Sequence, residues 1–173
     1  MNETLRTLKE RRSCRKYQDR QVETAALDAI LEAGTYAPTG MNRQAPVIVA
    51  VQDKETRDKI AKMNAAVMGV DSDPFYGAPT VVVVLADPAV RTYVYDGALV
   101  MGNLMNAAHA VGVDSCYIFR AKEVFATEEG KAMLRSWGIP DHFEGIGNCI
   151  LGYREEGGVK EASARKADYI VKV

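Results

Sequence analysis

The heptapeptide TVVVVLA, residues 80–86, contains six consecutive apolar residues, four of which are valines. A short β-branched run of this kind predicts a strand, and apolar residues at both odd and even positions predict burial on both faces. Such a strand lies in the middle of its sheet and needs a covering layer on each side. This stretch therefore predicts a sheet enclosed between two layers of helices.

Helices that could form these layers lie on either side of the strand in the sequence. KETRDKIAKMNAAVMG, residues 54–69, has the pattern of an amphipathic helix closed by Gly69. DGALVMGNLMNAAHAVG, residues 96–112, is apolar on nearly every side. A helix of this composition belongs to a large core or to a subunit interface. Because 173 residues can hardly surround a whole helix, the pattern favours a dimer.

The remaining segments continue the alternation of helices and strands. Helices are expected over residues 1–10, 25–37 and 127–138, and strands over 46–51, 115–119 and 146–153, with a possible edge or swapped strand at 168–173. This order predicts an α+β or α/β sandwich with helices on both faces of one sheet. The length predicts one domain spanning residues 1–173.

Composition narrows the functional classes. The chain is 47% hydrophobic and 26% charged, with no apolar run long enough to span a membrane and no signal-like N-terminal stretch. Its three cysteines are far apart and lack CxxC spacing, which favours free thiols and a cytoplasmic location. Neither histidine has carboxylates at ligand spacing, so no metal site is predicted. No nucleophile motif or catalytic triad is visible.

The segment RRSCRKY, residues 11–17, is the strongest chemical feature. Residues 1–20 carry seven basic and three acidic side chains in a chain of net charge -1. In extended backbone, Arg11, Ser13 and Arg15 share a face, where guanidinium groups and a hydroxyl can close around one phosphate. A solvated basic surface and a nucleic-acid-binding arm are the alternatives. The run is short, with Tyr17 as its only aromatic residue, and this favours a compact anion over a polymer.

A second polar segment, APTGMNRQAP at residues 37–46, lies between a predicted helix and a predicted strand. Thr39, Asn42 and Gln44 offer donors and acceptors in an order suited to the edge of a heterocycle. Taken alone, the segment is equally typical of an ordinary loop, because glycine and proline interrupt it.

The two segments together resemble those of the FMN-dependent nitroreductase family, which carries RRSxRxF after its first helix and APSxxNxQPW before a strand. The stretches YGAPTVVVVLAD, DGALVMGNLMNAAHAVGVDSCYI, and ILGY followed by ARK are similar to later family segments, in the same order. The resemblance implies an α+β fold, an α/β/α sandwich around a mixed, mainly antiparallel sheet. It also implies an intertwined homodimer with two FMN sites at the subunit interface.

The resemblance also implies which residues bind the cofactor. Phosphate and ribityl contacts fall to Arg11, Arg12, Ser13 and Arg15, with Arg165 reaching the same phosphate from the C-terminal segment. Flavin contacts fall to Pro38, Thr39, Gly40 and Asn42 of the other subunit, and to Asn64, Ile118, Phe119 and Arg120. No protein side chain is implied as catalytic, since the chemistry is carried by FMN.

The implied activity is ping-pong electron transfer from NADH or NADPH, through the flavin, to nitro compounds, quinones or other small acceptors. A flavin-dependent dehalogenase-like enzyme and a non-catalytic FMN-binding or storage protein remain alternatives. The chain departs from the family at QAP in place of QPW, at Asp114 where glycine is common, and at Arg120 where a small residue is common. Arg120 implies a pocket that is narrower or more favourable to anions.

Overall fold

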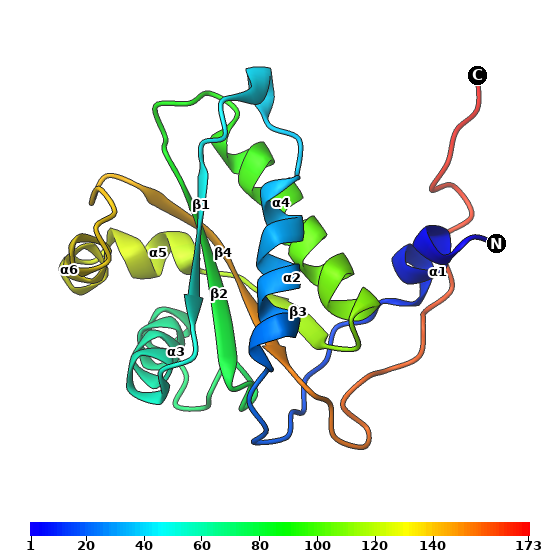
Figure 1. Cartoon of the computed structure of the whole chain (residues 1–173), viewed down its shortest axis with the longest axis horizontal. Helices are drawn as coiled ribbons and strands as arrows, with labels where there is room; N and C mark the ends of the chain where they lie inside the picture. Colours follow the sequence, from blue (N-terminus) through cyan, green and yellow to red (C-terminus); the bar gives the residue numbers. More distant parts are fainter.

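The computed structural model describes all residues, 1–173 (Figure 1). Six α-helices, one 3-10 turn and four strands follow one another as α1 (Glu3–Glu10), α2 (Thr24–Thr35), η1 (Gly40–Asn42), β1 (Pro46–Val51), α3 (Lys54–Met68), β2 (Thr80–Ala86), α4 (Tyr93–Ala110), β3 (Asp114–Ile118), α5 (Ala121–Ala126), α6 (Glu128–Ser136) and β4 (Glu144–Gly152). The predicted α+β class is confirmed.

The four strands form one sheet in the order β1-β2-β4-β3, and all neighbouring pairs are antiparallel. Val49 pairs with Val83 in the first ladder, and Val82 pairs with Cys149 in the second. Beyond these strands, an isolated bridge joins Ser13 to Ser115 in parallel orientation. A mainly antiparallel sheet with a parallel pairing at the β3 edge results.

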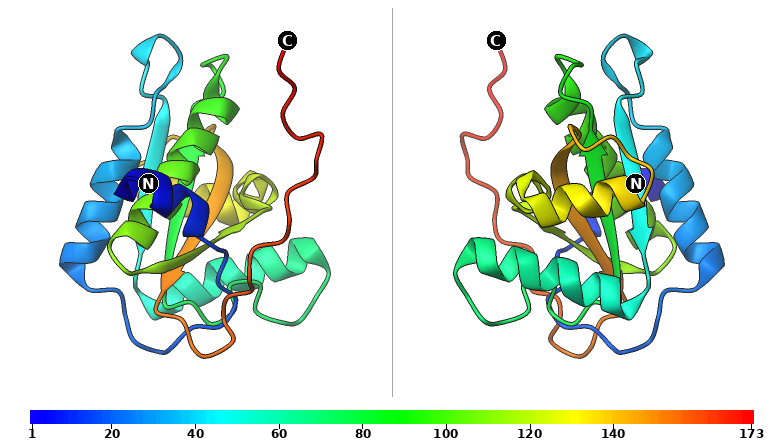
Figure 2. Two further views of the ribbon diagram at one scale, coloured as in Figure 1. Left: turned by 90° about the vertical axis from the view of Figure 1, so that its right-hand side faces the viewer. Right: turned by 90° about the vertical axis from the view of Figure 1, so that its left-hand side faces the viewer.

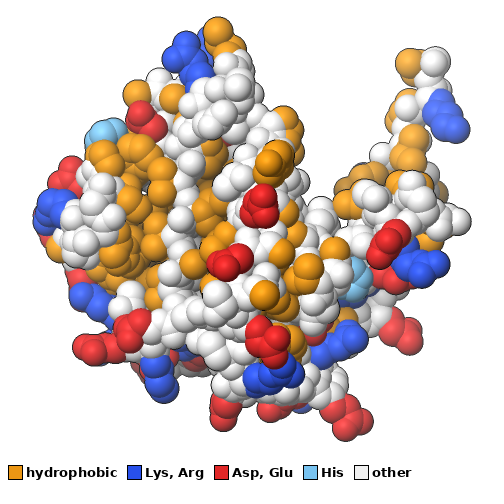
Figure 3. Space-filling view, viewed as in Figure 1, with side chains coloured by type: hydrophobic (Ala, Val, Ile, Leu, Met, Phe, Trp, Pro, Cys, Tyr) orange, Lys and Arg blue, Asp and Glu red, His pale blue; other side chains and the backbone are white.

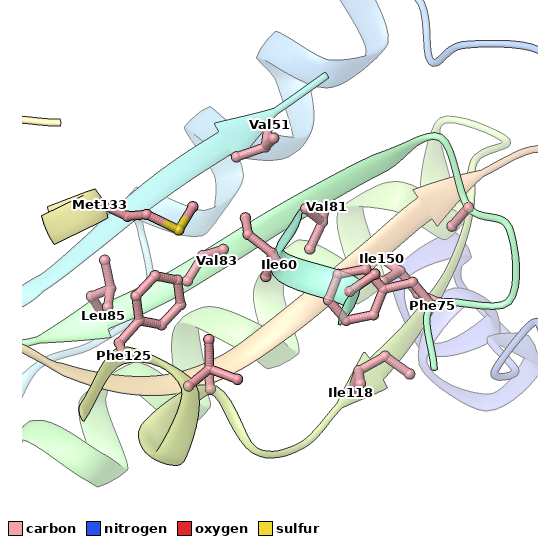
Figure 4. Close-up of a cluster of buried hydrophobic side chains, with 14 of the residues drawn as sticks. Val51, Ile60, Phe75, Val81, Val83, Leu85, Ile118, Phe125, Met133 and Ile150 are labelled. Atoms are coloured by element: carbon pink, nitrogen blue, oxygen red, sulfur yellow. The ribbon is translucent and has the colours of Figure 1, made fainter. Parts of the chain in front are cut away.

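Strand β2 is the centre of the sheet, as its sequence predicts, and all seven of its residues are buried. Its side chains alternate between two cores. Val81, Val83 and Leu85 face the core beneath α3, α5 and α6, which Figure 4 shows with Ile60, Phe125 and Ile150. Val82 and Val84 face the core beneath α2 and α4. Figures 1 and 2 show these helices on opposite faces of the sheet, so the predicted sandwich is confirmed.

Local signals set several helix ends. Asp53 caps α3 by accepting a hydrogen bond from the backbone N–H of Thr56, and Gly69 closes the helix in the left-handed conformation. Thr127 caps α6 in the same way, accepting from the N–H of Gly130. Gly69 and Thr127 lie at the helix ends that the sequence predicts, whereas the cap at Asp53 is seen only in the structure.

The structure differs from the sequence expectations in two places. Helix α5 was not expected, because it is short and lies between a strand and a capped helix. The segment 168–173 forms no strand, and the whole tail from residue 160 is exposed. A strand needs a neighbouring edge, and the tail extends away from the body of its own chain (Figures 1 and 3). None of the helices has the length and apolar character required to cross a membrane.

Candidate functional site

Residues 11–17 run as an extended segment beside β3. Ser13 bridges to Ser115, and the N–H of Cys14 donates to the carbonyl of Ser115 at 3.0 Å. On the other side, the N–H of Arg15 donates to the carbonyl of Gly158 at 2.8 Å. The extended conformation turns alternate residues to opposite sides, and Cys14 is fully buried in the core. The inward packing of Cys14 is a consequence of that alternation.

Arg11 points its guanidinium toward the sheet and leaves a donor unused. Its Nη1 atom is buried and has no hydrogen-bond partner. The group lies near the buried Cys149, whose pKa is raised to about 12 by burial and by Cys116, an effect that the positive charge of Arg11 partly opposes. The hydroxyl of Ser115 is also buried without a partner. Buried polar groups without a partner are energetically costly. An anion bound here would supply the missing acceptor for Arg11 and Ser115.

The other two arginines of the segment have different surroundings. The Nη1 of Arg12 donates to the carbonyls of Lys9 and Arg11, both at 2.7 Å. It therefore closes the C-terminal end of α1, where carbonyls have no helical partner. Arg15 is exposed and forms no side-chain hydrogen bond or ion pair. Arg15 and the buried Nη1 of Arg11 thus have free donors at this site, whereas the Nη1 of Arg12 is engaged.

The loop that contains Pro38, Thr39, Gly40 and Asn42 is unusual in its backbone. Met41, Asn42 and Gln44 all have positive φ angles of 49–54°. Residues other than glycine rarely adopt this left-handed backbone conformation. Those that do are concentrated where function requires a particular geometry. Of the five non-glycine residues with positive φ in the chain, three lie here and a fourth is Arg120. The loop at residues 37–46 and the turn at Arg120 therefore hold four of the five non-glycine residues with positive φ.

Helix α4 anchors this loop. The buried carboxylate of Asp96 accepts from the N–H of Gly40 at 3.0 Å and from the hydroxyl of Thr92 at 2.9 Å. A Cβ atom on Gly40 would lie 2.3 Å from the Thr92 hydroxyl oxygen, so any other residue would require Thr92 to move. The loop also borders a cavity of about 270 Å³, lined in part by Gln44 and Val100. Asp96 thus fixes the loop at Gly40, while residues 41–44 stay exposed.

The turn after β3 carries Ile118, Phe119 and Arg120. Ile118 is buried, Phe119 is exposed, and Arg120 has a φ of 74°. Asn64 is fully buried on α3; its amide donates to the carbonyl of Phe119 at 2.9 Å and accepts from the Nε of Arg120 at 3.0 Å. Both polar atoms of Asn64 are therefore used within the chain, whereas the terminal nitrogens of the half-buried Arg120 have no partner there.

A charged cluster follows this turn directly. Glu144 accepts from the hydroxyl of Tyr93 and pairs with the ammonium group of Lys122, both at 2.8 Å. The hydrogen bonds from Lys122 and Tyr93 lower the pKa of Glu144. The same contact with Glu144 raises the pKa values of Lys122 and Tyr93. The three side chains link the beginnings of α4, α5 and β4.

Within one chain, the predicted residues are separated rather than gathered into one site. Arg11, Ser13 and Arg15 lie beside the beginning of β3, and Ile118 to Arg120 lie at its other end with Asn64. The loop at Gly40–Asn42 lies at a distant end of the molecule, and Arg165 lies in the exposed tail (Figure 1). Two larger cavities, of about 480 and 460 Å³, border Arg57 and contain none of the predicted residues.

Comparison with known proteins decides the family. A family model described as "Nitroreductase family" matches residues 8–73. A provisionally named NADH dehydrogenase/NAD(P)H nitroreductase of Archaeoglobus fulgidus is 31% identical over 162 residues, which cover 90% of this chain and 88% of the relative. The chain belongs to the nitroreductase family. The resemblance seen in the sequence is thereby confirmed.

Solved structures agree with this assignment. A nitroreductase with bound FMN from Bacteroides fragilis is 32% identical, with a TM-score of 0.91 over the full length of both chains. A second FMN-bound nitroreductase, from Desulfitobacterium hafniense, is 28% identical, with a TM-score of 0.88 over 100% of this chain and 99% of the other. The nitroreductase fold of this chain therefore extends from end to end.

Sequence patterns missed the side chains that hold the predicted site of this nitroreductase in shape. Asp96 supports the loop at Gly40, Asn148 donates to the carbonyl of Ile118 at 3.4 Å, and Ser115 lies beside Ser13. One signal was available, because Asn148 interrupts an apolar strand and Asp96 begins an apolar helix. A buried polar residue in such a position requires a partner, although the sequence does not identify it.

Proposed function

We propose that this chain is an FMN-dependent NAD(P)H oxidoreductase that reduces nitro compounds, quinones or related small acceptors, and that residues 1–173 act as one FMN-binding unit. Family membership supports the reaction class, since relatives include an NAD(P)H-dependent FMN reductase of Bacillus subtilis, 37% identical over 76 residues covering 44% of this chain and 30% of that protein. FMN bound in the similar nitroreductases supports the choice of cofactor.

The buried, unpaired Nη1 of Arg11 is the observation that carries the proposal. A guanidinium donor removed from water without an acceptor is unfavourable, and a phosphate oxygen would supply that acceptor. The neighbouring residues fit the same group, since Ser13 offers a hydroxyl and Arg15 a second free guanidinium. Arg165 is proposed to reach the phosphate from the exposed tail, where it forms no hydrogen bond or ion pair within its own chain.

Strand β3 provides the span between the two ends of the cofactor. Ser13 lies beside Ser115, and Arg120 lies five residues further along. At about 3.3 Å per residue, the two points are separated by at most roughly 16 Å. A phosphate at Arg11 and a ring near Phe119 and Arg120 would place the ribityl chain along this strand. Asn64 would act through Arg120, whose position it sets.

The proposed chemistry divides between the cofactor and the chain. When bound, FMN supplies a ring that takes hydride from NADH or NADPH and passes electrons to an acceptor entering the same pocket in turn. The residues of the chain bind and orient. Arg11, Ser13 and Arg15 hold the phosphate, while Phe119 and Arg120 border the place where nicotinamide and acceptor alternate. No side chain is assigned a covalent role.

A second copy of the chain is proposed to complete the site. The loop at Pro38–Asn42 lies far from Arg11 in its own chain, so it serves the site of the partner (Figure 1). Exposed apolar residues support this homodimer: on α4, Tyr95 is 73% exposed, and in the tail, Ile170 and Val171 are 75% and 80% exposed. The outer edge of β1 has no neighbour within the chain and offers a place for the exchanged tail.

The test uses the purified full-length protein. We expect a yellow dimer, or a protein that becomes yellow on addition of FMN, whose flavin absorbance bleaches with NADH or NADPH and recovers with a quinone. Comparing both donors and a set of acceptors defines the specificity. Flavin that neither nicotinamide reduces would instead indicate an FMN-binding or storage protein, and halide release from halogenated substrates would indicate a dehalogenase. A protein that takes up no FMN would refute the proposal.

A further inference from the structure

The turn at Ile118–Arg120 is held more firmly than a surface turn requires. Two fully buried asparagines from different elements bond consecutive carbonyls: Asn148 of β4 donates to Ile118 at 3.4 Å, and Asn64 of α3 donates to Phe119 at 2.9 Å. Arg120 follows in the left-handed conformation, with a φ of 74°. Strained backbone persists where surrounding contacts determine it, and it is concentrated at functional sites.

The guanidinium of Arg120 is oriented but not neutralised. Its Nε donates to Asn64 at 3.0 Å, which fixes the plane of the group. It forms no ion pair, and its terminal nitrogens have no partner in the chain. The contrast with Arg57 is informative, because Arg57 pairs with Asp58 and Asp73 and also bonds the carbonyl of Ala78. Arg57 is therefore a structural arginine, whereas Arg120 retains capacity to bind an anion.

An exposed aromatic side chain lies next to Arg120 in the sequence. Phe119 precedes Arg120 and is 65% exposed, although large apolar side chains are usually buried. A planar ring can pack on Phe119, and a planar carboxylate can accept two hydrogen bonds from one guanidinium. The turn thus offers separate contacts to the two halves of an aromatic carboxylate.

We propose that this turn makes the enzyme selective for aromatic electron acceptors that carry a carboxylate, with Arg120 binding the carboxylate and Asn64 positioning Arg120. The inference rests on the proposed function, since it concerns the acceptor used by the same site. A phosphate would also satisfy Arg120, and NADPH carries one that NADH lacks. The exposed ring of Phe119 next to the guanidinium of Arg120 favours the carboxylate of an aromatic acceptor. The experiment below distinguishes this carboxylate from the phosphate of NADPH.

The experiment compares 4-nitrobenzoate with 4-nitrobenzyl alcohol as acceptors for the FMN-loaded enzyme. We expect the wild type to have the higher kcat/KM for the carboxylate, and Arg120→Gln to lower the ratio of the two values about tenfold or more, the effect of one lost charged hydrogen bond. Arg120→Lys should give an intermediate ratio, because lysine keeps the charge but not the planar fork. Using a ratio cancels any general loss of activity in the variant.

Binding provides a second measurement and a control. Isothermal titration of the oxidised holoprotein with benzoate, which cannot be reduced, should show affinity that falls about tenfold in Arg120→Gln. The matched control is Arg135→Gln, which removes one positive charge from α6, where Arg135 pairs with Asp141 on the surface. This control should leave both the acceptor ratio and benzoate affinity unchanged.

Two outcomes would overturn the inference. One is an acceptor ratio and benzoate affinity that are equal in wild type and Arg120→Gln. The other is a change in the NADPH-to-NADH preference of Arg120→Gln without a change toward benzoate, which would assign Arg120 to the nicotinamide phosphate. Both outcomes arise with an FMN-loaded, reducible protein. Failure to bind FMN or to accept electrons from either donor would instead refute the proposed function itself.

Discussion

The Nε of Arg120 donates a 3.0 Å hydrogen bond to the side-chain oxygen of Asn64, which is fully buried on α3. This contact joins the end of β3 to a helix 56 residues earlier in the chain. The position of the Arg120 side chain therefore depends on two features: the hydrogen bond to the buried amide of Asn64 and the left-handed backbone of Arg120 itself. Sites with this property are open to direct tests.

The backbone of Arg120 provides the first prediction. Arg120→Gly and Arg120→Ala both remove the contact with Asn64, but only alanine must keep a Cβ in the left-handed region. We expect the glycine variant to be more stable than the alanine variant by about 1 kcal/mol. Urea unfolding of the two proteins measures the difference. Equal stabilities would show that the turn relaxes and that its strain is not enforced.

Arg11 and Arg15 provide the second prediction. Arg11→Ala and Arg15→Ala should each weaken FMN binding by about 1.5–3 kcal/mol, the free energy of a lost charged hydrogen bond. Titration monitored by flavin fluorescence measures the affinity. Arg12→Ala should have a smaller effect, because Arg12 is engaged with the carbonyls of Lys9 and Arg11. Arg6→Ala, an exposed change on α1, is the control, and unchanged affinity in both main variants would disprove the phosphate assignment.

The contact between Gly40 and Thr92 provides the third prediction. Gly40→Ala places a methyl group 2.3 Å from the Thr92 hydroxyl and 2.9 Å from its methyl group, so it should destabilise the protein by about 1–3 kcal/mol. Thr92→Ala removes both clashing atoms. In the double variant, the cost of Gly40→Ala should therefore fall, which a double-mutant cycle measured by thermal unfolding detects. Strictly additive effects would place the loop elsewhere.

Glu144 provides a prediction about pH. Hydrogen bonds from Lys122 and Tyr93 lower the pKa of Glu144. The charged carboxylate is therefore more stable in the folded state than in the unfolded state. The resulting stability is present above the ordinary carboxyl pKa of about 4.3 and is lost as the pH falls through the lower folded value. The melting temperature of wild type should exceed that of Glu144→Gln at pH 7, and the gap should close below about pH 4. Glu161→Gln, in the exposed tail, should show no such gap at either pH.

The exposed tail provides the last prediction. Ile170→Asp should raise the dimer dissociation constant at least about tenfold, because burial of a side chain of this size is worth about 1.5–3 kcal/mol and a buried carboxylate is unfavourable. Light scattering after size exclusion gives the mass, and absorbance gives the FMN content, which should fall with the dimer. Lys160→Asp, before the apolar run, is the control. A monomeric wild type with full flavin occupancy would contradict the shared site.

The fold was largely predictable because its decisive signals are local. The run at residues 80–86 is apolar on both faces, and this alone requires two covering layers. Asp53 and Thr127 cap helices through bonds to residues three positions away, a relationship that sequence spacing contains. Helix α5 has only six residues, too few for a clear hydrophobic period, and it has no side-chain cap. No local sequence signal therefore predicted it.

For the candidate site, the sequence supplied a list of candidate residues but not their arrangement. The segments 11–17 and 37–46 could be recognised from their residue types and order. Which side chains remain free could not, because this depends on partners far along the chain. Arg11, Arg12 and Arg15 look alike in sequence, yet Arg11 keeps a buried donor unpaired and Arg12 uses its donors on α1.

By itself, the sequence determined a sheet enclosed between two layers of helices and the ends of several helices, because each follows from the period or spacing of nearby residues. It also predicted an anion-binding segment from its residue types. Only the tertiary structure decided that Asn64 holds Arg120 and that Asp96 holds the loop at Gly40. These bonds join residues 56 positions apart in both cases. Hydrogen bonds act over about 3 Å, so such pairs exist only after the chain has folded and brought them together.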